Sequence, residues 1–487
     1  MSLRSLGKTT ILYAFSSLCL RAAAFLLTPF FTRYLSLSQF GLLSTLFLTV
    51  QALSVAMSLG MRSGLLRFTK TYERDRKIGT LVGTSTLITL AGGIVVTLGC
   101  VVGLEPFFRS VMHGDNVAGL LLVTCMVALS QTLCFHLSSY YRAGNKALRY
   151  FLVSAGTAIA MMLANIACVV VLDLGIMGIL VSQAITYFAS CIVIGFDILP
   201  GTGFWFAAST LKELLRFGLP SALANSGQFI MGGATIYFVS YFGGLESTAV
   251  YALGYKLAQI TEFGLIVPFQ LANEAFIFSN LATPGITSKI SRSLTYFLLI
   301  YTFVAVSILL FVKVCFPVIA PPQYHEAYLV VILMLPALMF KASAYFGETL
   351  LGAVHKNYIS GILFTALSLL SLAMNYFLVP TMGWLGAVVT SNSCYAVMGL
   401  TALLVGARLM GIRLEIKRLL GVFGAFVSFL VLFFLLRNMA GIFTVCVSAC
   451  ASALGILLIF QSSFVAHHER TLIREQLRRV KLCAPHP

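Results

Sequence analysis

Five charged side chains interrupt long apolar stretches of this sequence, and their types suggest a chemistry. They are the cations Arg21, Lys256 and Lys341 and the carboxylates Glu262 and Glu348. A charge near the centre of a bilayer costs about 2.5–3.5 kcal/mol on insertion scales, so a charge kept there usually has a use. Arginine and lysine favour phosphate oxygens. Because the cations outnumber the acids, the set predicts a cavity that attracts an anion.

Polar side chains recur at helical spacing beside these charges. One stripe runs through the stretch 248–272 at i, i+4, i+8 and i+11 and consists of Tyr251, Tyr255, Gln259 and Glu262, with Lys256 at its flank. Other stripes contain Gln51, and Asn225 with Gln228. A polar side chain that faces lipid finds no partner, so such stripes line a water-filled cavity or join helices through hydrogen bonds. For Gln51, Asn225 and Gln228 both readings stay open.

The acidic residues are not positioned in the sequence to form ion pairs with Arg21 and Lys256. Lys256 and Glu262 are six residues apart, about 120° around a helix, so we do not expect them to pair with each other. The first six apolar stretches contain no carboxylate in their middle portions. A structural ion pair needs an acid nearby, which favours a ligand-binding role for Arg21 and Lys256.

The elements that carry these residues are predicted to be membrane-spanning helices. Of the 487 residues, 59% are hydrophobic and only 10% are charged, which excludes an ordinary soluble domain. Apolar windows of about 20 residues, long enough to cross a bilayer, lie at 10–32, 40–60, 78–103, 117–139, 150–172, 174–196, 217–242, 248–272, 294–316, 327–349, 358–380, 384–407, 419–436 and 440–464. The first window contains Arg21 and Pro29 and lacks a small-residue cleavage site, so it is not a cleavable signal peptide.

The net charge of +17 is distributed asymmetrically about these windows. With both termini cytoplasmic, 25 Lys and Arg residues lie on the inner side and four on the outer side. This is the positive-inside pattern, so we expect a multi-pass protein with cytoplasmic termini rather than a nucleic-acid-binding protein. In the basic tail, 468–481, apolar and basic residues segregate, which predicts a segment lying on the anionic inner surface.

Several other classes of site lack support in the sequence. The eleven cysteines are scattered without a CxxC pair or a Cys/His cluster, so they predict neither a metal site nor a disulfide framework. No P-loop spacing is present. The outer loops are at most about a dozen residues, too short to build an external enzyme domain. We therefore expect no cofactor, no metal and no catalytic residues.

The chain repeats itself at an offset of about 208 residues. "YYRAGNKALRYFL" (140–152) corresponds to "LLGAVHKNYISGIL" (350–363), and Asn165 before "GIMGILVS" corresponds to Asn375 before "GWLGAVVT". Six helices per copy return the chain to the same side, which implies two parallel six-helix lobes. We expect lobes at 1–205 and 206–415, two extra helices within 416–464, and a basic cytoplasmic tail at 465–487.

Three stretches resemble Wzx-type polysaccharide flippases of the multidrug/oligosaccharidyl-lipid/polysaccharide (MOP) exporter superfamily. They are "FLLTPFFTRYLSLSQFGLLS", with "SLGMRSGLLRF" before a basic loop, "YFGGLESTAVYALGYKLAQI" and "YRAGNKALRY". The resemblance implies a MOP/MATE-like fold, a central cationic cavity and transfer of undecaprenyl-pyrophosphate-linked oligosaccharide to the outer leaflet of the bacterial inner membrane. By position, Arg21 and Lys256 match cavity cations beside a portal between the first and eighth helices. Peptidoglycan-precursor flippases carry an Arg–Asp pair where this chain has Arg21 and an alanine, which disfavours that subgroup.

These observations define a leading expectation and two alternatives. The expected protein is a lipid-linked oligosaccharide flippase, with a proton or sodium ion coupled through Glu262 or Glu348. The expected substrate-binding residues are Arg21, Lys256, Lys341, Gln51, Asn225, Gln228, Tyr255 and Gln259. Expected partners are membrane lipids, a polysaccharide polymerase and a chain-length regulator. The alternatives are a cation-coupled multidrug exporter, which needs cavity acids, and a membrane-embedded polymerase.

Overall fold

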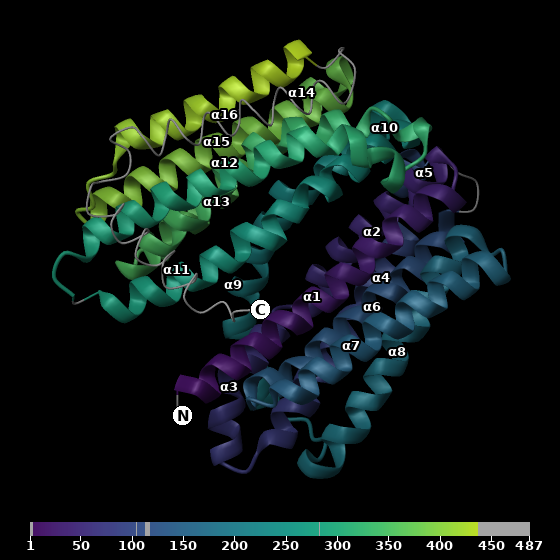
Figure 1. The fold of residues 1–487 in the computed structure, drawn as a ribbon. Coiled ribbons are helices and arrows are strands. Elements are labelled where there is room, and N and C mark those ends of the chain that lie inside the picture. The colour runs from purple at the N-terminus through teal and green to yellow at the C-terminus, as the bar shows by residue number, and fades with distance from the viewer. Residues whose placement is uncertain (1–2, 104, 113–116, 282, 437–487) are drawn as a thin grey trace, which may run out of the picture. The chain divides into compact units, whose positions relative to one another are not determined.

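The computed structural model describes residues 3–103, 105–112, 117–281 and 283–436, and their regular elements are all helical (Figure 1). The first half contains α1 (Leu3–Tyr34), α2 (Leu37–Ser58), α3 (Met61–Arg74), α4 (Ile78–Gly103), α5 (Glu105–Met112), α6 (Val117–Ala143), α7 (Ala147–Ile166), the π-helical η1 (Ala167–Val171) and α8 (Gly175–Thr202). The second half contains α9 (Ala208–Gly233), α10 (Thr235–Thr261), the π-helical η2 (Glu262–Ile266), α11 (Val267–Asn280), α12 (Ile286–Ile319), the 3-10 helix η3 (Pro322–Tyr324), α13 (Ala327–Ala353), α14 (Asn357–Met382), α15 (Trp384–Leu409) and α16 (Ile416–Leu436).

Ten helical stretches in the described part of the chain are long and apolar enough to cross a membrane. Their surfaces carry many exposed apolar side chains, such as Val95, Phe196 and Phe377, with exposed fractions of 68–77%. Outside a membrane such exposure would be unfavourable. The predicted all-α polytopic membrane fold is confirmed. The window at 440–464 and the tail at 465–487 lie outside the described residues.

The predicted windows at 217–242 and 248–272 differ from the helices that form there. Helix α9 ends at Gly233, and α10 begins at Thr235 and contains a break at Gly244, where φ is 76° and ψ is 176°. Glycine tolerates this left-handed backbone, so the chain turns at Gly244. The helix then passes through the π turn η2 before α11. The break at Gly244 falls in the gap between the two predicted windows, whereas hydropathy could not locate the π turn, which lies inside the window 248–272.

The internal repeat appears in the helix boundaries. Helices α6 and α13 begin at Val117 and Ala327, 210 residues apart, and both have 27 residues. Asn165 and Asn375 are both buried, and each side-chain amide donates to the carbonyl four residues earlier over 2.8 Å. The predicted repeat is confirmed in the order of the helices and in this detail.

The turns between repeated helices also correspond. Asn145 (φ 55°) and His355 (φ 58°) are left-handed residues 210 positions apart, each following a long helix. In both turns the residue after the left-handed one donates its backbone N–H to a carbonyl of the last helical turn. Lys146 N donates to Tyr141 O over 2.8 Å, and Lys356 N donates to Leu351 O over 2.9 Å. This is the Schellman arrangement, in which the left-handed position favours glycine or asparagine.

Replacing His355 with glycine is expected to raise the free energy of unfolding by about 0.5–1 kcal/mol. A non-glycine residue in the left-handed region costs roughly 1–2 kcal/mol, and glycine's greater entropy in the unfolded chain offsets part of that gain. Thermal unfolding of the purified protein measures the change. Asn145→Gly is the matched control and should gain less, because asparagine tolerates this conformation. An unchanged or lower unfolding temperature for His355→Gly would contradict the argument.

The chain divides into two compact units. Unit 1 comprises residues 1–256, 318–330 and 358–394, and unit 2 comprises 257–317, 331–357 and 395–487. Each unit thus collects segments that are distant in sequence. The expected lobe boundaries at 205 and 415 stay predictions.

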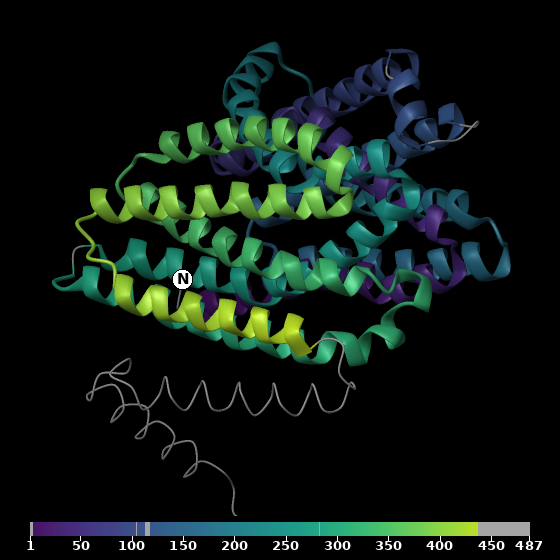
Figure 2. The same cartoon turned by 90° about the horizontal axis from the view of Figure 1, so that it is seen from above.

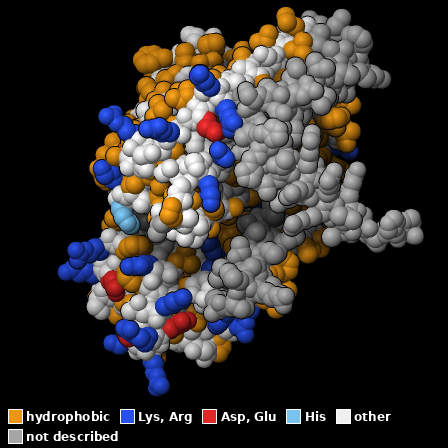
Figure 3. Space-filling model, turned by 60° about the vertical axis from the view of Figure 1, so that its left-hand side comes forward, with side chains coloured by type: hydrophobic (Ala, Val, Ile, Leu, Met, Phe, Trp, Pro, Cys, Tyr) orange, Lys and Arg blue, Asp and Glu red, His pale blue; other side chains and the backbone are white. Residues whose placement is uncertain are grey.

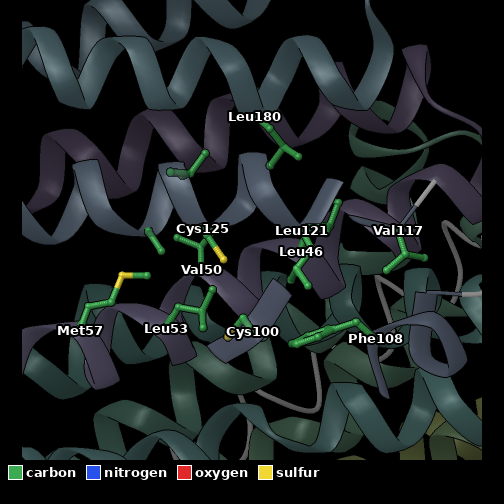
Figure 4. Close-up of a cluster of buried hydrophobic side chains, with 12 residues drawn as sticks. Leu46, Val50, Leu53, Met57, Cys100, Phe108, Val117, Leu121, Cys125 and Leu180 are labelled. Carbon is green, nitrogen blue, oxygen red and sulfur yellow. The ribbon is translucent and has the colours of Figure 1, made fainter. Parts of the chain in front are cut away.

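Unit 1 has a tightly packed interior. Leu46, Leu121 and Cys125 of one buried cluster are fully inaccessible, and Figure 4 shows this cluster formed by side chains from α2, α4, α5, α6 and α8. Helix α2 begins with a capping box, in which Ser36 Oγ accepts from Gln39 N at 3.2 Å and Gln39 Oε1 accepts from Ser36 N at 3.0 Å. The cap satisfies N–H groups that a helix start otherwise leaves unpaired.

Helix α3 in unit 1 is amphipathic. It buries Met61 and Leu65 and exposes Arg67, Lys70 and Arg74. Figure 3 shows Lys and Arg side chains, in blue, spread over the middle and lower part of this face, while hydrophobic side chains, in orange, are densest toward its top. Such a separation of basic and apolar surface is typical of a membrane protein with a basic inner edge.

Unit 2 is built around α12 and α13. In both ribbon views α12, α13 and α16 run in similar directions (Figure 1, Figure 2). The Tyr301 side chain of α12 is fully buried, and its hydroxyl donates to Leu335 O of α13 over 2.8 Å. This bond satisfies a polar group that would be costly to bury alone. These two helices therefore form a fixed frame for charged side chains inside the unit.

Candidate functional site

Lys256 reaches a neighbouring helix within unit 1. Its Nζ donates to the backbone carbonyl of Ala24 on α1, with an Nζ–O distance of 3.0 Å. The same carbonyl accepts from Thr28 Oγ1 at 3.0 Å. The contact with Ala24 is to a neutral backbone oxygen and leaves the positive charge of Lys256 uncompensated there, which matters for attraction of an anion.

Arg21 lies on the same part of α1. It is three residues before Ala24, and residues at i and i+3 lie on one face of a helix. Its side chain is exposed. The Lys256 contact therefore places a second cation, from a distant part of the sequence, against the α1 carbonyl that lies one helical turn after Arg21. The family resemblance predicted both residues beside a portal between the first and eighth helices, which stays a prediction, and it did not indicate the carbonyl that anchors Lys256.

The polar stripe around Lys256 does not form one continuous accessible face. Tyr251 and Tyr255 are buried and their rings stack with centroids 6.0 Å apart, whereas Gln259 is half-buried. Glu262 falls in the π turn and belongs to unit 2. A π turn adds a residue to the helical turn, so the i, i+4 register used to predict the stripe does not continue through it.

The remaining expected substrate-binding residues have different surroundings. Gln51 is exposed on α2. Asn225 and Gln228 lie on α9, but their side chains are outside the described ones. Binding roles for these residues, and for Tyr255 and Gln259, stay predictions.

A second charged group lies within unit 2. Lys341 Nζ of α13 is 2.7 Å from Glu262 Oε1, and the two side chains are only 12% and 8% exposed. The expectation that Glu262 would not pair with Lys256 is consistent with this arrangement. Glu348 is half-buried on α13, seven residues or about two helical turns after Lys341, and lies near Glu274 of α11. Pairing with Glu262 compensates the charge of Lys341, whereas the contact of Lys256 among the described residues is with a neutral carbonyl.

Aromatic rings surround the Lys341 ammonium. The Nζ atom is 5.8 Å from the ring centroid of Tyr345 and 5.4 Å from that of Tyr395. Rings at this distance attract a cation. Tyr345 follows Lys341 by one helical turn and could be found from spacing. Tyr395 is on α15, and no local sequence signal indicates that it meets Lys341.

The fold is that of transporters of the MOP superfamily. The chain is similar to an inward-facing multidrug resistance MATE family transporter of that superfamily, at 16% identity and a TM-score of 0.64, covering 83% of this chain and 94% of the other. It is also similar to a MOP superfamily transporter from Pyrococcus furiosus whose binding pocket has reversed polarity, at 16% identity, a TM-score of 0.57 and coverage of 84% and 95%. A Vibrio cholerae MATE transporter, VcmN, gives 14% identity, a TM-score of 0.59 and coverage of 84% and 97%.

The family follows from the sequence itself. The model of the family described as "Polysaccharide biosynthesis protein" matches residues 6–273, more than half of the chain. The chain therefore belongs to this family of the MOP superfamily. No curated protein matches the sequence. Its apolar helices and its fold make it a multi-pass membrane protein whose fold is shared with solved transporters.

Proposed function

We propose that this protein is a flippase for a lipid-linked oligosaccharide with a pyrophosphate head. The observation that carries the proposal is the approach of Lys256 to α1 beside Arg21, with a neutral carbonyl as its anchor. Two adjacent cations suit the oxygens of a pyrophosphate, with arginine able to bind two oxygens at once. Family membership supports a substrate from polysaccharide biosynthesis.

The remaining parts of the proposal follow the same chemistry. The polar side chains of Gln51, Asn225 and Gln228 contact sugars, and the lipid tail stays in the membrane. The lobes alternate between inward- and outward-open forms, with a proton or sodium ion as the coupling ion. Undecaprenyl is the lipid that the family resemblance implies. The Lys and Arg distribution favours cytoplasmic termini. The family resemblance implies the bacterial inner membrane, where a polymerase and a chain-length regulator would act on the product.

Transfer between leaflets of reconstituted vesicles tests this proposal. A fluorescent undecaprenyl-pyrophosphate saccharide is loaded into one leaflet, and its arrival in the other is measured with a membrane-impermeant quencher. We expect protein-dependent transfer of this probe and little transfer of a phosphate-free lipid saccharide. A fluorescent organic cation, added to parallel vesicles, tests the multidrug alternative. Export of that cation without transfer of the lipid saccharide would overturn the proposal in favour of a multidrug exporter.

A further inference from the structure

The Lys341–Glu262 ion pair of unit 2 is energetically costly. Both groups are nearly withdrawn from solvent, and their contact is 2.7 Å long. Removing two charges from water costs several kcal/mol per ion, which their attraction repays only with good geometry and further hydrogen bonds. Apolar side chains of similar volume often stabilise a fold equally well. A pair of this kind therefore calls for a reason beyond packing.

The carboxylate is only half satisfied. Among the described residues, Glu262 Oε2 has no hydrogen-bond partner, and the residue is 6% exposed. The hydroxyl of Tyr301 lies near Glu262, but it donates to Leu335 O. A buried, unpaired oxygen of an ionised carboxylate is unfavourable, and a bound proton reduces that cost. Glu262 is thus placed to take up a proton when its ammonium partner leaves.

The ammonium has a second means of support. The ring centroids of Tyr345 and Tyr395 lie 5.8 and 5.4 Å from Nζ. Cation–π attraction reaches about 2 kcal/mol in desolvated surroundings, so Lys341 can lose its carboxylate and remain charged. Glu262 also lies in a π turn, an element often found at functional sites. The two partners can therefore separate without either being left uncompensated.

We propose that Lys341 and Glu262 form a proton-coupled switch. A phosphate oxygen of the transported head competes with Glu262 for the Lys341 ammonium. When Lys341 turns to the phosphate, the Glu262 carboxylate takes one proton from water. When the phosphate leaves, that proton returns to water and the ion pair closes again. Head-group binding and proton uptake are thereby linked, and this inference rests on the proposed anionic substrate.

Titratable side chains face the ion pair from three helices. Tyr301 faces the pair from α12, Tyr345 from α13 and Tyr395 from α15. Glu348 and Glu274 form a separate acidic group on α13 and α11. Of these side chains, Glu262 is the carboxylate that contacts Lys341, so the switch assigns the coupled proton to Glu262 rather than to Glu348.

Calorimetry of the full-length protein in lipid nanodiscs tests this assignment. Inorganic pyrophosphate and the undecaprenyl-pyrophosphate saccharide are titrated in buffers of different ionisation enthalpy, which reports the protons taken up per ligand bound. We expect uptake approaching one proton with the lipid-linked probe. Uptake with inorganic pyrophosphate would show that the head alone operates the switch. An equal response to added anionic phospholipid would overturn the assignment to a transported head.

Single substitutions distinguish the role of Glu262 from that of Lys341. Glu262→Gln should abolish proton uptake while keeping or tightening binding, because Glu262 then no longer competes for the Lys341 ammonium as an ionised carboxylate. Lys341→Met should weaken binding about tenfold or more, the usual cost of losing a charged hydrogen bond. Glu415→Gln is the matched control, since it removes the acid of another ion pair in unit 2, with Arg418 at 3.1 Å, and should retain uptake. The double variant Glu262→Gln/Lys341→Met should unfold at a higher temperature than Lys341→Met alone, because the single variant leaves a buried acid unpaired.

The outcomes distinguish this inference from the proposed function. If the lipid-linked probe does not bind the unaltered protein, the proposed substrate is wrong. If it binds without proton uptake, only the switch is wrong. Unchanged uptake in Glu262→Gln, or its loss in Glu348→Gln alone, would also overturn the switch.

Discussion

Lys256→Ala is expected to lower the rate of head-group transfer at least tenfold, and Lys256→Arg is expected to keep most of it. The ammonium extends to α1 and contacts only a neutral carbonyl there, so its charge remains available to a phosphate. A hydrogen bond to a charged group contributes about 1.5–3 kcal/mol, which corresponds to roughly 10- to 150-fold in binding. The vesicle transfer assay with equal amounts of each variant provides the measurement.

Arg21 provides the companion variants for this prediction. Arg21→Ala should reduce transfer to a similar extent, and Arg21→Lys should restore it only in part, because lysine lacks the planar group that binds two oxygens. Lys289→Ala is the matched control, because Lys289 is an exposed cation near the start of α12. Full transfer by both Lys256→Ala and Arg21→Ala would exclude their role in binding the head.

Gly41→Ala is expected to destabilise the protein by more than about 2 kcal/mol or to prevent its accumulation in the membrane. A Cβ atom at Gly41 would lie 1.9 Å from the carbonyl oxygen of Leu245, an approach that the backbone must relieve. Leu245 directly follows the turn at Gly244, so the start of the helix that carries Lys256 packs on α2 at this point. Overpacking of a dense interior costs typically 1–3 kcal/mol, and a backbone neighbour can yield less than a side chain.

Gly156→Ala is the control for the loss of a helical glycine. No described atom beyond the chain neighbours and the helix's own backbone lies within 4 Å of the added Cβ at Gly156 on α7, so the change should raise helix stability by up to about 1 kcal/mol. Thermal unfolding in detergent and the yield of monodisperse protein compare the two variants. Equal stability of Gly41→Ala and Gly156→Ala would mean that the close packing of α2 on Leu245 is not required.

Much of the fold could be predicted because the signals are local. Apolar windows predicted most of the helices. Matching segments at a constant offset predicted the repeat, and the corresponding turns at Asn145 and His355 share a left-handed residue. The π turn at Glu262–Ile266 was harder to predict, since hydropathy averages over a local change of helical register inside the window 248–272. The family resemblance is confirmed across residues 6–273.

The candidate site was predictable only in its residue types. Spacing along one helix could identify Arg21, Lys256 and Lys341 as charges within apolar segments, and could exclude a pair between Lys256 and Glu262. It could not identify the Ala24 carbonyl as the contact of Lys256, because backbone oxygens are present at every position. Nor could it bring Tyr395 to Lys341, because these residues lie on different helices.

By itself, the sequence determined that this is a polytopic helical membrane protein with a repeated architecture and excess positive charge inside its apolar segments. Composition, hydropathy and repeat offset are properties of the chain that hold whatever the helices contact. Only the tertiary structure decided that Lys341 is compensated by Glu262, whereas Lys256 contacts a backbone carbonyl beside Arg21. Coulomb attraction and hydrogen bonding act over a few ångströms, so packing between distant segments determines which charge is compensated.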